Sequence, residues 1–130
     1  MKNIISSLTI LGITTTILGS SSFAQTSEIE EFHVVGNEPF WDIKIEKTGI
    51  VYQALDQKTQ YFPYFYPLSA QGRPIDQVRV YQLRGKRNNM LILNRVESCS
   101  DTMSEKNYPY SATLIMGNQV FDGCAEKKIK

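Results

Sequence analysis

Histidine and cysteine are scarce in this chain of 130 residues, which contains one histidine, His33, and two cysteines, Cys99 and Cys124. Zinc sites use three or four Cys, His or carboxylate ligands at short spacings, and no such cluster is present. A serine or cysteine nucleophile needs a base within hydrogen-bond reach, and only His33 could act as a histidine base. We therefore expect no catalytic residue, metal site or cofactor, and we do not expect an enzyme.

A charge excess of one sign is also lacking, because 14 basic residues face 13 acidic ones. Without Lys2, which belongs to the export signal described next, the two numbers are equal. A neutral domain has no electrostatic footprint for nucleic acid and is not steered to anionic membrane surfaces. We expect no nucleic-acid partner.

No apolar run reaches the roughly 20 residues that a membrane-spanning helix needs. The longest one, residues 4–18, follows the positive charge of Lys2 and precedes small residues at Ser22 and Ala24. This order predicts a secretory signal peptide over residues 1–24, cleaved near Ala24. The mature chain would then have no stable membrane span and would be periplasmic or secreted. A retained anchor is the alternative, and no Cys lies near the cleavage site to carry a lipid.

Export would place Cys99 and Cys124 in an oxidising compartment, where two cysteines normally join. We predict a Cys99–Cys124 disulfide, which would contribute roughly 3.5 kcal/mol by the loop-entropy estimate. A redox pair is the alternative. Such pairs usually have the spacing Cys-x-x-Cys at the start of a helix, and this pair has neither feature.

Helical periodicity and internal repeats are absent, whereas residues 41–46 alternate apolar and charged side chains as a half-buried strand does. Trp41, Ile43 and Ile45 are expected to point inward. Two prolines limit residues 61–67 to an edge strand or an extended loop. The other predicted strands cover residues 32–35, 50–55, 78–83, 90–96, 111–116 and 119–121.

Turn signals between these segments recur every 8–12 residues or so, which favours an all-β fold. We predict a small antiparallel barrel or sandwich of about seven to eight short strands with one disulfide. The expected organisation is a flexible lead-in at residues 25–30, a single β domain at 31–126 and a loose basic tail at 127–130. Residues 99–110 are expected to form a long polar loop. The basic cluster of Arg84, Lys86 and Arg87 is predicted to be a solvated hairpin tip, with a docking patch as the alternative.

Two groups of residues go beyond generic β sequence. The first is Gly-Asn-Glu-Pro-Phe-Trp at residues 36–41. The second comprises Cys-Ser-Asp-Thr-Met-Ser at 99–104, Tyr-Pro-Tyr at 108–110 and Gly-Cys-Ala at 123–125. Together they resemble a family of small exported bacterial proteins, lipoproteins among them, with the motifs Gly-x-Glu-Pro-Phe-Trp, Cys-x-Asp-Gly-Met-Ser, Tyr-Pro-Tyr and Gly-Cys-Ala.

The resemblance spans residues 36–125 and implies a disulfide-linked β domain, but it supplies no catalytic residues. Thr102 stands where the family has Gly. If that position requires a positive φ, Thr is strained there and the loop is shaped differently. The lipoprotein Cys is missing as well, so the resemblance implies an untethered member.

Polar and aromatic side chains suggest where the protein binds a partner. The candidates are Ser100, Asp101, Ser104, Tyr108 and Tyr110 of the disulfide-linked loop, Tyr61, Tyr64 and Tyr66 of the aromatic run, and Glu38 and Trp41 at the proline turn. Each group also has a structural interpretation. The polar side chains of the loop would hydrogen-bond within it, the aromatic run would cover the core, and Trp41 would lie in the core. His33 is expected to face outward.

The function that these residues favour is a non-enzymatic binding module of the cell envelope. Its partner would be an envelope protein, a glycan or a small ligand. The alternative hypothesis is an inhibitor of a cell-wall hydrolase such as lysozyme, by analogy of fold and compartment alone.

Overall fold

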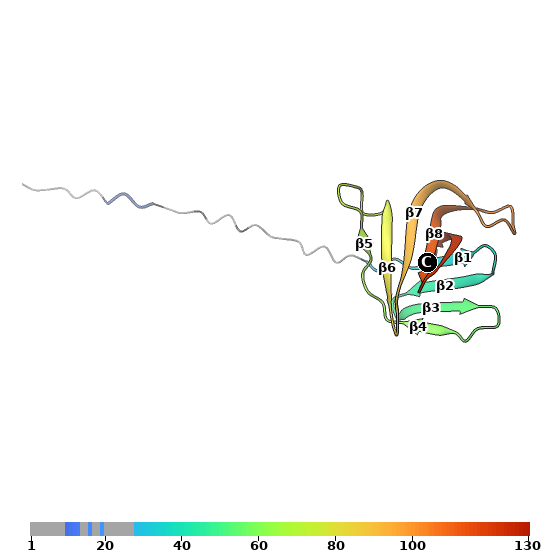
Figure 1. Ribbon diagram of the computed structural model, residues 1–130. Coiled ribbons are helices and arrows are strands. Elements are labelled where there is room, and N and C mark those ends of the chain that lie inside the picture. Colours follow the sequence, from blue (N-terminus) through green and yellow to red (C-terminus); the bar gives the residue numbers. More distant parts are fainter. Residues whose placement is uncertain (1–9, 14–15, 17–18, 20–27) are drawn as a thin grey trace, which may run out of the picture.

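The computed structural model describes residues 10–13, 16, 19 and 28–130 (Figure 1). Most of the predicted signal peptide, residues 1–24, and its cleavage point after Ala24 lie outside the described residues. Within the described ranges, no helix is long and apolar enough to cross a membrane.

The described chain is all-β, and the predicted fold class is confirmed. Nine antiparallel strands form one sheet, where about seven to eight were predicted. The strands are β1 (Phe32–Gly36), β2 (Trp41–Glu46), β3 (Gly49–Ala54), β4 (Gln60–Phe62), β5 (Leu68–Ser69), β6 (Val78–Arg84), β7 (Asn88–Ser100), β8 (Asn107–Met116) and β9 (Gln119–Lys127).

The sheet is built from two meanders that meet in its middle. Its strand order is β4-β3-β2-β1-β9-β8-β7-β6-β5, so the first four strands form one meander and the last five form the other. The pairing of β1 with β9 joins them. The sheet curls into a half-barrel, and the segment between β4 and β5 runs from one sheet edge to the other (Figure 1).

The inner face of the curled sheet carries the hydrophobic core. Trp41, Ile43 and Ile45 of β2 are buried there, as the alternation in residues 41–46 predicts. Lys44 faces outward and is exposed. Asp42 shares that outer face but is mostly buried, and its carboxylate is hydrogen-bonded to the His33 ring on the neighbouring strand.

Trp41 packs at the point where the two meanders join. Gly36 of β1 lies opposite Gly123 of β9, and the indole ring covers both. A Cβ atom on Gly36 would lie 2.1 Å from Nε1 of Trp41, and one on Gly123 would lie 2.3 Å from the carbonyl oxygen of Val35. Only glycine fits at either position, because any side chain would occupy the space that the indole and the neighbouring backbone fill.

A buried ion pair anchors the start of the domain. The Arg79 side chain is 4% exposed, and its Nη2 lies 2.6 Å from Oε2 of Glu30. Its guanidinium also lies over the Phe32 and Tyr110 rings, at 5.1 and 5.5 Å from their centroids. Burial acts to raise the pKa of Glu30, but hydrogen bonds from Lys127 and Arg79 outweigh it and hold that pKa below its usual value. The Glu30 side chain is therefore held by two cations, Arg79 and Lys127.

Three strands extend well beyond their predicted bounds. β7 continues to Ser100, β8 begins at Asn107 and β9 reaches Lys127, so the long loop predicted at 99–110 shrinks to residues 101–106. Burial stops alternating in the second half of β7, and the β7–β8 register shifts between Arg95 and Cys99. A strand that lacks alternation and contains an irregularity gives no period-2 signal in its sequence. Just after β9, the Lys128 amide donates to the Glu31 carbonyl at 2.9 Å.

We predict that Gly123→Ala lowers the free energy of unfolding by about 3 kcal/mol or more, because its methyl group would collide with backbone. Urea denaturation followed by Trp41 fluorescence measures this. Gly85→Ala is the matched control, since the nearest atom to its Cβ would be a Phe62 ring carbon at 3.4 Å. Equal stability of the two variants would contradict the packing role of Gly123.

Candidate functional site

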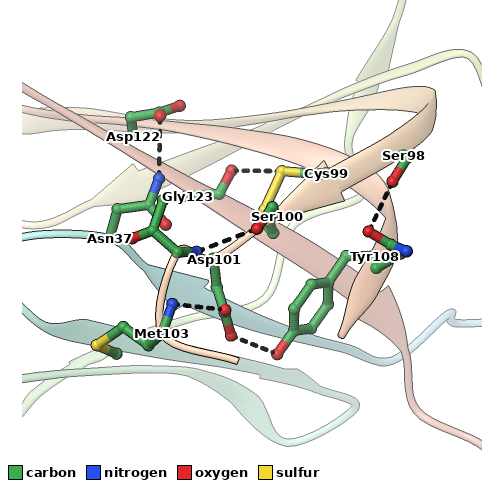
Figure 2. The surroundings of a disulfide bond; sticks show 12 residues. Asn37, Ser98, Cys99, Ser100, Asp101, Met103, Tyr108, Asp122 and Gly123 are labelled. Atoms are coloured by element: carbon green, nitrogen blue, oxygen red, sulfur yellow. Dashed lines mark hydrogen bonds between the residues drawn. A yellow bond between two sulfur atoms is a disulfide. The ribbon is translucent and has the colours of Figure 1, made fainter. Parts of the chain in front are cut away.

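The predicted disulfide is present, and it lies beside the junction of the two meanders (Figure 2). Cys124 directly follows Gly123 and pairs with Val35 of β1 and Ser111 of β8. Its partner Cys99 lies near the end of β7, just beyond the register shift. The bond therefore holds the far end of β7 against the central strand of the sheet.

Asp101 organises the short loop between β7 and β8 (Figure 2). Its Oδ1 accepts hydrogen bonds from the backbone N–H groups of Met103 and Ser104, at 3.0 and 2.9 Å. Its Oδ2 accepts one from the Tyr108 hydroxyl at 3.2 Å. The Ser104 hydroxyl lies within hydrogen-bond distance of both oxygens. One mostly buried carboxylate thus fixes the whole turn, as the structural interpretation of this loop predicts.

The hydrogen bonds to Asp101 also set its acidity. The Ser104 backbone N–H makes the largest contribution, and with the bonds from Met103 and Tyr108 it holds the pKa of Asp101 below its usual value. Burial raises the pKa of the Tyr108 hydroxyl, and donation to Asp101 raises it further. The pair is therefore a stable carboxylate and phenol at neutral pH.

Thr102 adopts a left-handed backbone conformation, with φ of 62°. This is the position where the resembling family has Gly, and the positive φ explains why Gly suits it. The Thr102 side chain is exposed, so its β-branch gains no packing to offset the strain. The loop therefore keeps the backbone conformation that Gly favours, although Thr occupies the position.

We predict that Thr102→Gly raises the free energy of unfolding by about 1 kcal/mol, since removal of Cβ relieves the left-handed strain. Chemical denaturation measures this. Thr48→Gly is the matched control: Thr48 is also an exposed turn residue, but its φ is not positive, so the change should not stabilise. A destabilised Thr102→Gly protein would show that Thr102 is not strained.

We predict that Asp101→Asn destabilises the protein at neutral pH and that the difference from wild type shrinks in acid. Because the folded pKa of Asp101 is lowered, its ionisation stabilises the fold fully above the unfolded pKa of about 3.9. That contribution disappears as the pH falls from about 4 through the folded pKa. Unfolding free energies of both proteins from pH 7 to pH 2 check this, and a constant difference across that range would contradict it.

Aromatic side chains dominate the segment that joins the two sheet edges. We define the edge-bridging segment as residues 60–68, from β4 to the start of β5. Tyr64 is half-buried and packs edge-on against Tyr66 and the core residue Tyr81, at 5.6 and 6.4 Å between ring centroids. The Arg84 guanidinium lies 4.2 Å from the centroid of Phe65. The segment is thus held in place by Tyr64 and Phe65, while Tyr61 and Tyr66 are 76% and 61% exposed.

The structure divides the residues of the predicted contact surface into buried and exposed ones, with Tyr64 half-buried between the two groups. Trp41, Asp101, Tyr108 and Tyr110 are buried and serve the core or the loop. Glu38, Tyr61, Tyr66, Ser100 and Ser104 are exposed. Phe65 and Arg84 of β6 are not among the candidate contact residues, although Arg84 belongs to the predicted basic cluster. Phe65 stands in the same aromatic run, whereas nothing in the sequence signals the contact with Arg84.

His33 faces outward, as expected, and its ring pairs with the Asp42 carboxylate across β1 and β2. No serine or cysteine of the described residues is hydrogen-bonded to it. Within the same described ranges, no group of three or more His, Cys, Asp or Glu side chains could hold a metal ion.

The chain matches no protein-family model, no curated protein and no solved structure. The family resemblance carried by the four motifs therefore stays a prediction.

Proposed function

We propose that this protein is an exported, non-enzymatic binding module of the cell envelope, and that the edge-bridging segment is its contact surface. The observation that carries the proposal is the exposure of large apolar side chains on a segment held rigidly to the core. Tyr61, Tyr66 and Leu68 are 76%, 61% and 56% exposed, while Tyr64 anchors the chain between them.

Rigid, exposed aromatic residues suit recognition. A tyrosine offers a large apolar ring and a hydroxyl, and it loses little conformational entropy on binding. Because Tyr64 and Phe65 already fix the backbone of this segment, a partner would have little chain to order. The short edge strands β4 and β5 form the two ends of the segment and leave backbone groups for a partner to pair with.

Two features support the choice of compartment. The predicted signal peptide and the disulfide are both typical of proteins outside the cytoplasm. The cell envelope would then supply the partner, which is an envelope protein, a glycan or a small ligand.

The proposal is tested by cosedimentation of the purified, oxidised protein with cell-wall sacculi and by crosslinking to envelope extract. We expect a Tyr61→Ala/Tyr66→Ala double variant to bind about tenfold more weakly, because two exposed anchors are lost. Val120→Ala, which removes an apolar side chain that is 67% exposed, is the control and should bind normally.

Absence of binding to both materials would contradict the proposal, as would equal weakening by Val120→Ala. Stoichiometric binding of purified lysozyme would instead favour the hydrolase inhibitor.

A further inference from the structure

A cleft of about 580 Å³ lies at one end of the half-barrel, between β3 and β4 on one side and two hairpin tips on the other. We call it the tip cleft. The tips are the β6–β7 turn, which contains Gly85, Lys86 and Arg87, and the β8–β9 turn, which contains Gly117. The volume is within the range of small-molecule sites.

Contacts between separate elements give the tip cleft its shape. Asn89 of β7 accepts a hydrogen bond from the Gly117 backbone N–H at 2.9 Å, which ties the two hairpin tips together. The Arg87 side chain lies across Gly117, where a Cβ would come within 2.9 Å of Nη1. Phe62 of β4 approaches Gly85 from the opposite side. The cleft is therefore formed jointly by β4 and two hairpin turns, and not by a single loop.

The charge of the tip cleft is entirely positive. Lys86 and Arg87 line it, and no aspartate or glutamate does. Neither cation has an ion-pair or hydrogen-bond partner among the described residues. Many of the other cations are paired: Arg79, Arg95, Lys106, Lys127 and Lys128 each contact a carboxylate. The hairpin tip that the sequence predicts to be merely solvated thus places two uncompensated charges at a cavity.

A buried amide adds a donor to these charges. Asn89 is 7% exposed, and its Oδ1 is occupied by the Gly117 N–H. Its Nδ2 group donates to no described residue. The amide is therefore available to donate to a ligand in the cleft that Asn89 lines.

Aromatic rings complete the lining. Tyr52, Tyr61, Phe62 and Phe121 all border the tip cleft. Flat rings favour a flat apolar group by stacking and by burial of its surface. Cations and an amide donor favour a carboxylate, phosphate or sulfonate group.

We propose that the tip cleft binds a small organic anion with a flat apolar body, its acidic group held by Lys86, Arg87 and the Asn89 amide and its body held against the aromatic residues. This site goes beyond the proposed function, because it gives a cleft and a ligand chemistry that the contact surface does not specify. Tyr61 borders both the cleft and the contact surface. The charge variants at Lys86 and Arg87 leave that surface unchanged, so failure of anion binding and failure of sacculus binding are distinguishable.

The test is titration of the purified, oxidised protein with 2-naphthoate, followed by amide shifts in NMR spectra. We expect shifts at Gly85, Asn89 and Gly117, and about tenfold weaker binding of the neutral 2-naphthamide. Arg87→Gln and Lys86→Gln should each weaken naphthoate binding several-fold. Arg73→Gln removes the same charge from an exposed loop outside the cleft and is the matched control.

The Asn89→Asp variant tests the amide donor specifically. It keeps an oxygen to accept the Gly117 N–H but replaces the amide donor with a second carboxylate oxygen. We expect loss of naphthoate binding with an unchanged unfolding midpoint. If that midpoint falls, the Lys86 and Arg87 variants decide the outcome.

Equal affinity for naphthoate and naphthamide would overturn the proposal, as would an equal effect of Arg73→Gln. Binding of dextran sulfate without naphthoate would also overturn it, because a general basic surface would then explain the charge.

Discussion

The junction between β1 and β9 is the constraint on which the rest of the structure depends. It joins the two meanders, and Trp41 covers it only because Gly36 and Gly123 face each other without side chains. A buried Trp brings a large apolar surface to this point, but it fits only where the backbone leaves room. The other strands pair in order on either side of this central pair. β2, β3 and β4 continue the sheet beyond β1, and β8, β7, β6 and β5 continue it beyond β9.

The motifs scattered along the sequence meet at this junction. The turn after Gly36 is tied to β9 by the Asn37 backbone N–H, which donates to the Asp122 carbonyl at 3.0 Å. Gly123 is followed by Cys124, whose disulfide brings in Cys99 and with it the loop that Asp101 organises. The residue types of the motifs are thus explained by packing, turn formation and cross-linking. Motifs of this kind indicate how the chain folds. The contact surface for a partner therefore has to be sought among exposed residues elsewhere in the molecule.

The sequence predicted the parts of the fold that depend on local rules. Alternation in residues 41–46 predicted which side chains of β2 are buried, and export chemistry predicted the disulfide. The second half of β7 could not be predicted, because its irregular pairing depends on residues far away in the sequence. The same limit applies to the buried role of Tyr108, which depends on a hydrogen bond to Asp101, and to the contact between Phe65 and Arg84.

Two arginines of the second meander differ in whether another group of the described chain balances their positive charge. Arg79 is enclosed by Glu30, a backbone carbonyl and two aromatic rings, so its donors and its charge are already satisfied. A buried cation without such partners would be costly, which explains why this site is complete. Arg87 lies on the next hairpin tip beside a cavity, and no carboxylate balances it within the described chain. Burial thus requires the charge of Arg79 to be balanced within the chain, whereas Lys86 and Arg87 at the tip cleft remain available to pair with the external anion proposed above.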